Sequence, residues 1–303
     1  MGSQMEHKIP VIDFTNEKLK PGTDDWVLAC KEVRYGFEEY GCFEAVYDKI
    51  PLELHNSVFA QTEDLFDLPL ETKMQKTSER PYHSYYGFSS LPLYESLGID
   101  HPTTLEGSQK FTNFMWPSGN DSFRENAQSI SKQLAELYEI ATRMVFDSYG
   151  LESGLYESNM ALTSYLLRFS KYRERKANET SDIGLQSHID RTFMSIVHQH
   201  QVEGLQVKSK DGQWLDVKPS PTSFLVLAGD VVGKKNMNRI PGPISLVHDT
   251  HWTAEKGWVD GAKSPHEYIL DFQQELELSE TQICEQILGC RPGYVEGVRK
   301  WVK

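Results

Sequence analysis

The tripeptide His188-Ile189-Asp190 constrains this chain more than any other stretch of its sequence. Side chains two residues apart on an extended segment project to the same side, so an imidazole and a carboxylate would share one wall. Two such ligands, joined by a histidine from elsewhere in the fold, form the facial triad that holds non-haem Fe(II) and leaves coordination positions open. We therefore take His188 and Asp190 as candidate metal ligands.

The residues that follow the tripeptide decide whether it indicates a metal site. A bare H-x-D pattern is weak evidence, because the chain has 10 histidines and many aspartates. Here a strand-like apolar run at 192–197 follows, and then V-E-G-L-Q-V, D-G-Q-W and S-F-L-V-L-A-G-D. His198 and His200 come too far along the chain to join the pair, so we interpret them as structural or supporting residues.

Residues 185–230 carry these motifs in the order found in a known family. They resemble the catalytic core of the plant 2-oxoglutarate/Fe(II)-dependent dioxygenases, in particular the AOP-like subgroup. The N-terminal part resembles the same family through I-P-V-I-D-F, Y-G-C-F and L-F-D-L-P-L-E-T-K, so the resemblance covers roughly residues 8–240. It implies a double-stranded β-helix, an Fe(II) cofactor, 2-oxoglutarate and O2 as co-substrates, and oxidation of a small organic molecule such as a specialised plant metabolite.

The same resemblance implies a role for Tyr172. An aromatic residue at this position of the family commonly points to 2-oxoglutarate, where its hydroxyl can bond a carboxylate. Family members often have Asn two residues earlier, where this chain has Ser170. The alternative is a half-buried strand tyrosine that contacts no ligand.

The chain departs from the family pattern after Gly229-Asp230. The family continues with W-S-N-x-R, H-R-V and R-x-S, whereas residues 231–240 read VVGKKNMNRI and the expected histidine position, near residue 245, is serine. The nearest histidine, His248, is our candidate third metal ligand. The R-x-S arginine, which would pair with 2-oxoglutarate through its planar guanidinium, has no counterpart, because no arginine lies between Arg239 and Arg291.

Residues 248–303 have a resemblance of their own. T-H-W-T-A-E-K-G-W-V and L-S-E-T-Q-I-C, followed by I-L-G-C-R-P-G-Y-V, are similar to the C-terminal segment of plant transposase-type proteins. We therefore expect a chimeric or truncated dioxygenase with a helical tail in place of its closing strands. The tail carries more acidic than basic residues, so we expect it not to bind DNA.

Apolar spacing predicts the elements of the remaining chain: strands at 9–14, 42–47 and 165–172, and helices at 26–40, 52–66 and 122–149. The aromatic-rich stretch 77–117 is predicted to form loops, which either line a pocket or cover the core. The expected class is α+β, with a helical N-terminal section on an incomplete double-stranded β-helix (jelly roll). We divide the chain into an N-terminal domain (8–118), a dioxygenase-like core (119–247) and the tail (248–303).

Composition narrows the possible partners. A net charge of −13 argues against a polyanionic ligand such as nucleic acid. The four cysteines form no C-x-x-C motif, and no apolar run reaches membrane-spanning length, so we expect a cytoplasmic protein with reduced thiols and no membrane contact. We expect a monomer.

Two functions from different classes follow from the sequence. The first is an Fe(II)- and 2-oxoglutarate-dependent oxidoreductase acting on a small substrate. The second is a catalytically inactive dioxygenase-like protein that binds at most a metal or a partner, because the second iron histidine and the 2-oxoglutarate arginine are missing from their usual motifs. A transposase fragment is excluded, since most of the chain has a different character.

Overall fold

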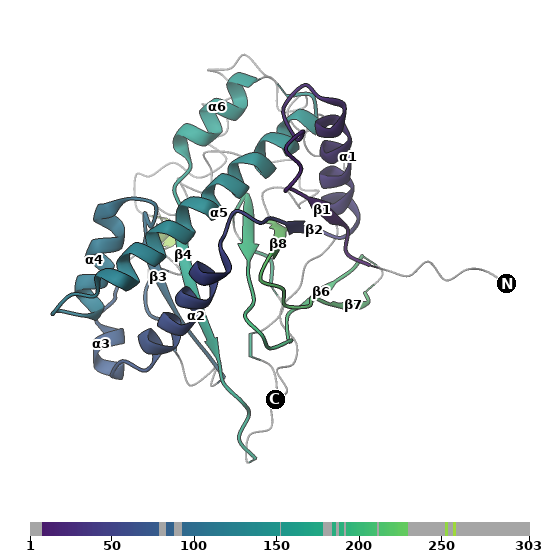
Figure 1. The fold of residues 1–303 in the computed structure, drawn as a ribbon. Coiled ribbons are helices and arrows are strands. Elements are labelled where there is room, and N and C mark those ends of the chain that lie inside the picture. Colours follow the sequence, from purple (N-terminus) through teal and green to yellow (C-terminus); the bar gives the residue numbers. More distant parts are fainter. Residues whose placement is uncertain are drawn as a thin grey trace.

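The computed structural model describes residues 8–78, 83–87, 93–151, 153–177, 184–185, 188–190, 192–210 and 212–229, and the backbone of 252–253 and 257–258. Within these ranges helices and strands are mixed, as an α+β fold requires (Figure 1). Among the described residues, no helix is both long and apolar enough to cross a membrane.

The N-terminal elements confirm the periodicity of the sequence. They are β1 (Val11–Asp13), α1 (Asp24–Glu39), β2 (Cys42–Val46), α2 (Leu52–Phe66) and a short α3 (Leu70–Met74). Helix α1 begins where Thr23 accepts a hydrogen bond from the Trp26 amide at 3.2 Å. Strand β1 pairs in parallel with β2 and forms an edge of the described sheet, as its proline-containing sequence predicts.

The long helix α5 (Asp121–Ser148) crosses the molecule and contacts α1, α2 and α4 (Leu105–Met115) (Figure 1). Asn120 caps it by accepting from the Phe123 amide at 3.1 Å. Near its other end, the Trp26 indole donates to Asp147 at 2.9 Å and ties α1 to α5. The apolar face of α5 is buried in the main core, as predicted for 122–149.

A four-stranded sheet lies against these helices in the order β1-β2-β8-β5, with β8 at Ser223–Ala228 and β5 at Met194–Val197. Strand β8 is antiparallel to both neighbours. Residues on the face toward the helices are fully buried: Phe43, Ala45, Phe224 and Val226. The sheet therefore takes strands from both sides of the boundary expected at residues 118 and 119.

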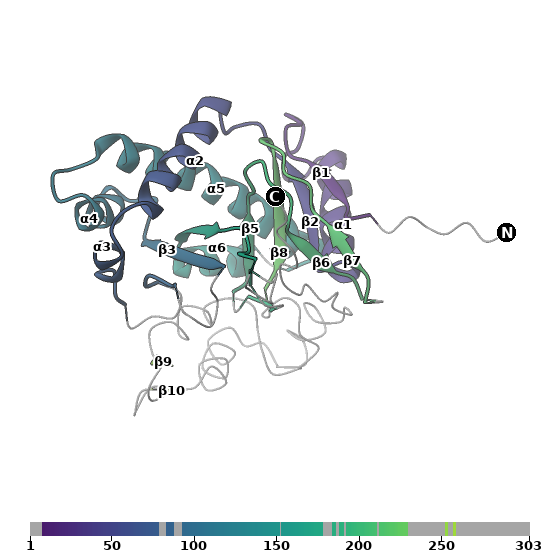
Figure 2. The ribbon, with the colours of Figure 1, turned by 90° about the horizontal axis from the view of Figure 1, so that it is seen from below.

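The opposite face of the sheet is covered by a hairpin of β6 (Gln206–Lys208) and β7 (Trp214–Asp216), which lies beside β8 in both views (Figures 1 and 2). Cys42 and Leu225 of the sheet form a second small core with Val207 and Val217. Gly212, with φ of 86°, adopts the left-handed backbone that this turn requires. Gln213 and Trp214 of the D-G-Q-W motif lead from this turn into β7.

A separate two-stranded sheet joins β3 (Tyr94–Asp100) to β4 (Leu166–Tyr172) in antiparallel register from Tyr94↔Tyr172 to Asp100↔Leu166. Strand β4 confirms the strand predicted at 165–172. Leu97, Ile99 and Phe169 of this sheet are buried in the main core. The alternate residues, among them Tyr94, Ser96, Ser170 and Tyr172, project to the other side of the sheet and form its polar face.

The expectation that 77–117 is irregular is wrong, because the stretch contains β3 and α4. Thr104 caps α4 by accepting from the Gly107 amide at 3.0 Å. A Cβ on Gly107 would lie 2.3 Å from the carbonyl oxygens of Asp100 and His101, so glycine is required where the strand turns into the helix. Polar residues surround the buried Phe111 and Met115 and hide the helical spacing. Helix α6 (Ser153–Leu162) also went unpredicted.

The C-terminal expectations fall mainly outside the described residues. Two short strands, β9 (Trp252–Thr253) and β10 (Gly257–Trp258), pair in antiparallel fashion near the beginning of the expected tail. The helices expected from residue 268 onward, and the segment where closing strands are expected to be missing, lie outside the described residues, as does His248.

Candidate functional site

The candidate metal ligands lie just before β5, in a segment without regular secondary structure. The distance between His188 Nε2 and Asp190 Oδ1 is 3.3 Å. The side chain of His188 is 47% exposed and that of Asp190 is 34% exposed, so both can be reached from solvent. The structure thus brings the two predicted ligands together.

The surroundings of Asp190 keep its carboxylate ionised. Burial by itself would raise the pKa of Asp190, but hydrogen bonds from His188 and Ser195 and the positive charge of Arg168 outweigh it and hold the pKa below its ordinary value. A metal ligand must be deprotonated, so this environment suits coordination of a divalent cation. An imidazole and a carboxylate are also donors that Fe(II) accepts.

The segment after the pair is fixed by the end of β8. The Gly229 amide donates to the Phe193 carbonyl at 2.9 Å, and Thr192 and Ser195 bond through their hydroxyls at 3.1 Å. The register then pairs Met194 with Ala228. Ser195, which sequence reasoning did not nominate, is therefore positioned to bond Asp190.

Tyr172 lies at the end of β4, on the polar face of the β3–β4 sheet. Its ring centroid is 4.9 Å from that of Tyr94, and the Tyr94 hydroxyl is 3.3 Å from Ser170 Oγ. Burial raises the pKa of Tyr172 well above its usual range, Tyr94 and Asp190 add to that rise, and Arg168 opposes it. The phenol is therefore protonated at neutral pH and can donate a hydrogen bond to a carboxylate.

Arg168 is the residue of this face that sequence reasoning missed. Its Nη2 donates to Ser96 Oγ at 2.8 Å, and its guanidinium carbon lies 6.0 Å from the centre of the Tyr86 ring. The signal was present in the sequence, because Arg168 and Tyr172 are four residues apart on one strand and so share a face.

His198 and His200 lie in a different cluster, at the end of β5 against α2. The His198 ring is 4.9 Å from that of His55 and stacks on Phe224 at 4.2 Å, while His200 stacks on Phe59 at 4.5 Å. Within the described ranges, no set of three His, Cys, Asp or Glu side chains is arranged to hold a metal ion. A third ligand for His188 and Asp190, such as the predicted His248, must come from outside these ranges.

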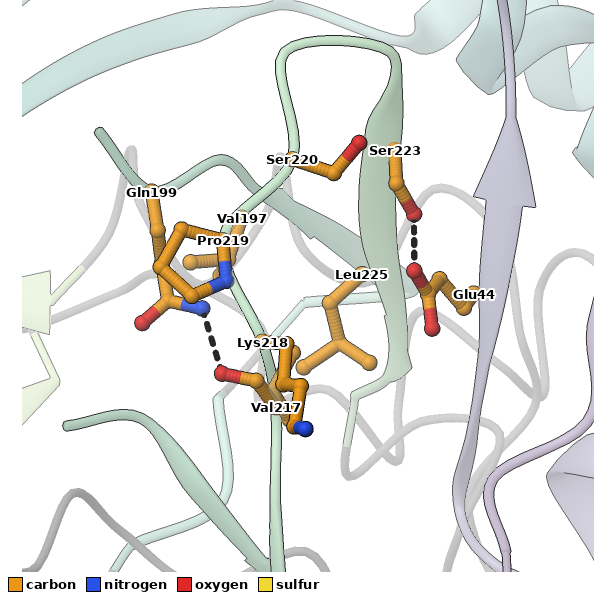
Figure 3. A pocket seen from close by; sticks show the side chains of 9 residues that line it. All are labelled: Glu44, Val197, Gln199, Val217, Lys218, Pro219, Ser220, Ser223 and Leu225. Atoms are coloured by element: carbon orange, nitrogen blue, oxygen red, sulfur yellow. Dashed lines mark hydrogen bonds between the residues drawn. The ribbon is translucent and has the colours of Figure 1, made fainter. Parts of the chain in front are cut away.

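A small pocket opens elsewhere, between β2, β8 and the chain after β7 (Figure 3). Two hydrogen bonds join residues that line it: Gln199 donates to the Val217 carbonyl at 2.9 Å, and the Ser223 hydroxyl donates to Glu44 (Figure 3). The predicted site residues are not among those that line it. Gln199, Ser223 and Glu44 are thus engaged within the pocket wall, and we assign the pocket no ligand.

An ionised carboxylate and an imidazole side by side supply two of the three ligands of a non-haem iron site of the two-histidine, one-carboxylate class. Comparison with known proteins agrees. The 2OG-Fe(II) oxygenase superfamily matches residues 160–241, and the N-terminal region of the non-haem dioxygenases in morphine synthesis matches residues 9–106. A probable 2-oxoglutarate-dependent dioxygenase of Arabidopsis thaliana, AOP1.2, is 43% identical over 245 residues, which cover 79% of this chain and 75% of that protein. The chain therefore belongs to the 2-oxoglutarate/Fe(II)-dependent dioxygenases, whose cofactor is Fe(II) and whose co-substrate is 2-oxoglutarate.

Two further proteins are similar over most of the chain. A protein of Arabidopsis thaliana named as a probable inactive 2-oxoglutarate-dependent dioxygenase, AOP2, is 28% identical over 327 residues, covering 80% of this chain and 81% of that protein. The solved structure of a dioxygenase for auxin oxidation from Arabidopsis thaliana, in a binary complex with 2-oxoglutarate, has a TM-score of 0.65 at 23% identity, covering 74% of this chain and 80% of that one. This likeness shows the shared fold, and with the family match it confirms the predicted relationship.

Proposed function

We propose that the chain is an oxidoreductase that uses Fe(II), 2-oxoglutarate and O2 to oxidise a small organic molecule, a specialised plant metabolite. One observation supports this proposal most directly: His188 Nε2 and Asp190 Oδ1 lie 3.3 Å apart, beside groups that keep the carboxylate ionised. His188 and Asp190 would supply two ligands for the metal, and His248 the third. Bound iron would supply the activation of O2.

The chain's own residues have distinct tasks in this proposal. His188 binds as a neutral imidazole, and Asp190 binds as a carboxylate held by Ser195. Tyr172 donates its phenolic proton in a hydrogen bond to a carboxylate of 2-oxoglutarate. Leu97 and Ile99 of β3 are fully buried in the helical core. Their packing keeps the β3–β4 sheet, and with it Tyr172, in place.

A second function has a specific observation in its favour. No arginine lies between Arg239 and Arg291, so the guanidinium that normally binds 2-oxoglutarate in this family has no sequence counterpart. The loss of one charge-assisted interaction costs about 1.5–3 kcal/mol of binding. A catalytically inactive dioxygenase-like protein that binds at most a metal or a partner is therefore the alternative. The resemblance of 248–303 to transposase segments supports a chimeric end in place of the closing strands. We further propose a cytoplasmic monomer whose dioxygenase-like part ends at residue 247.

Binding of Fe(II) and 2-oxoglutarate to the full chain under anaerobic conditions tests the proposal. We expect a weak visible charge-transfer band when both are present, and its loss in His188→Ala. His200→Ala is the matched control, because His200 stacks on Phe59 rather than lying beside Asp190. The band should also disappear in His248→Ala.

The two functions predict different results in this experiment. A band together with O2-dependent succinate formation supports the oxidoreductase. Metal binding without succinate supports the inactive alternative. A folded protein that binds no metal, or binds it equally well in His188→Ala, would contradict the oxidoreductase and leave only the inactive alternative.

A further inference from the structure

The register of β3 with β4 gathers polar side chains on one face of this two-stranded sheet. Tyr94 is paired with Tyr172, Ser96 with Ser170 and Gly98 with Arg168, so these residues all project to one side. The residues between them include Leu97, Ile99 and Phe169, which are buried in the helical core. The polar face is therefore the one turned away from the helices.

Arg168 occupies a particular place on this face. Its cross-strand partner is Gly98, which has no side chain and leaves room above the strand for the long arginine. The guanidinium is anchored by its bond to Ser96, a side chain that is completely buried. The guanidinium is thus held against β3 instead of moving freely in solvent.

The charge of Arg168 acts on both functional groups of the candidate site. It acts on Asp190 across the site, and on Tyr172 from the same face of the same strand. Arg168 and Tyr172 thus share one face of β4, and Asp190 lies close enough for the guanidinium charge to act on it. A ligand held beside Asp190 and Tyr172 would lie within the field of this guanidinium.

We propose that Arg168 binds a carboxylate of the molecule held beside His188 and Asp190. The proposal rests on the proposed function, and it assigns a cation to a site whose usual arginine motif is absent from the sequence. A planar guanidinium matches a carboxylate through parallel N–H donors. Two molecules could supply that carboxylate: 2-oxoglutarate, or the substrate that is oxidised.

Binding of 2-oxoglutarate to the Mn(II)-loaded full chain, measured by anaerobic calorimetry, tests this assignment. Arg168→Gln should weaken the affinity about 10- to 100-fold, the range for a lost charge-assisted hydrogen bond, and Arg168→Lys should recover part of the loss. The matched control is Lys171→Gln, which removes the same charge from the same strand but from the opposite face, where Lys171 pairs with Asp67. The control should bind 2-oxoglutarate as the wild type does.

A second set of titrations identifies the source of the carboxylate. Benzoate and phenylacetate are compared with benzamide and phenylacetamide on the chain loaded with Mn(II) and 2-oxoglutarate. If Arg168→Gln leaves 2-oxoglutarate binding intact but weakens the acids at least 10-fold and spares the amides, the assignment holds with the oxidised substrate as the source.

Three outcomes would overturn the assignment. Unchanged binding of 2-oxoglutarate and of the acids in Arg168→Gln would refute it and leave the proposed function standing. Loss of Mn(II) in Arg168→Gln, to the extent seen in His188→Ala, would show that Arg168 only positions Asp190. A wild-type chain that binds no Mn(II) would remove the proposed function as well.

Discussion

Gly229 lies against Thr192 with no room for a side chain. A Cβ on Gly229 would come within 1.7 Å of the Thr192 carbonyl oxygen, and the Gly229 amide is bonded to the next carbonyl, that of Phe193. Because Thr192 is two residues beyond Asp190, the end of β8 rests directly on the chain that carries the candidate metal ligands. The glycine of the G-D pair thus has a packing role close to the site.

Gly229→Ala should destabilise the fold and disturb the metal ligands together. The added methyl group meets a backbone carbonyl, which cannot rotate away as a flexible side chain could, so β8 or the segment 192–193 must shift. We expect a loss of about 3 kcal/mol in the free energy of unfolding, at the upper end of the range for overpacking. Urea unfolding measures the loss, and Mn(II) affinity reports the displacement of Asp190.

Gly154→Ala is the control for that substitution. Gly154 lies in α6, and a Cβ there would meet nothing within 4 Å. The change should be neutral or stabilising by up to about 1 kcal/mol, because alanine favours the helix. Equal stability of the two variants would contradict the packing role assigned to Gly229.

The histidine cluster predicts a loss of stability in acid. Burial lowers the pKa of His198 to about 4, and His55 and His200 lower it further, while the bond to the Ser223 carbonyl opposes the change. The groups that face it are His55, Phe59, His200, Ser223 and Phe224, with Glu63 beside His200. The unfolded chain takes up a proton near pH 6.5 and the folded chain only near pH 4, so this contribution is complete above pH 6.5 and is lost as the pH falls through that window.

Urea titrations at several pH values measure this contribution. Between pH 6.5 and 4, the wild type should lose about 2–3 kcal/mol more stability than His198→Gln, which cannot titrate there. Parallel pH profiles for the two proteins would show that His198 is not held neutral in the folded state.

Lys73 predicts a large effect from a single buried charge. It is 6% exposed, and its ammonium donates to the Phe66 carbonyl at 2.6 Å and to Glu95 at 2.8 Å. Lys73→Met leaves the Glu95 carboxylate without that cation, so we expect a loss of about 3 kcal/mol in the free energy of unfolding. Lys49→Met, whose exposed pair is with Glu136, should change it by less than about 1 kcal/mol. Similar effects of the two substitutions in thermal unfolding would show that the buried Lys73–Glu95 pair contributes no more to stability than the exposed Lys49–Glu136 pair.

Cys30 and Cys42 should react slowly with alkylating agents. Burial raises the pKa of Cys30 to about 12, with Asp147 adding to the effect, and burial also raises the pKa of the fully buried Cys42. Because the thiolate is the reactive form, alkylation at pH 8 should be more than about 100-fold slower than in the urea-unfolded chain. A time course by peptide mass spectrometry separates the two sites, and rapid labelling of Cys42 would mean that β2 and β8 separate.

Several elements could be predicted because their evidence is local. The apolar spacing of α1, α2 and α5 repeats with the helical period, and the alternation in β4 repeats with the strand period. Helix α4 was missed because its core contacts, through Phe111 and Met115, are few and its first turn is set by the meeting of Gly107 with the end of β3. The candidate site was predictable for the same reason, because a spacing of two residues is local evidence that His188 and Asp190 lie close together.

By itself, the sequence determined the family, most of the helices and strands, and the candidate pair of metal ligands, because each of these depends on residues close together in the chain. Only the tertiary structure brought Arg168 near Asp190, placed His55 against His198, and set Gly229 on Thr192. These contacts join segments far apart in sequence. Strand register and the packing of helices on the sheet determine which residues meet in these contacts. Local periodicity in the sequence does not predict them.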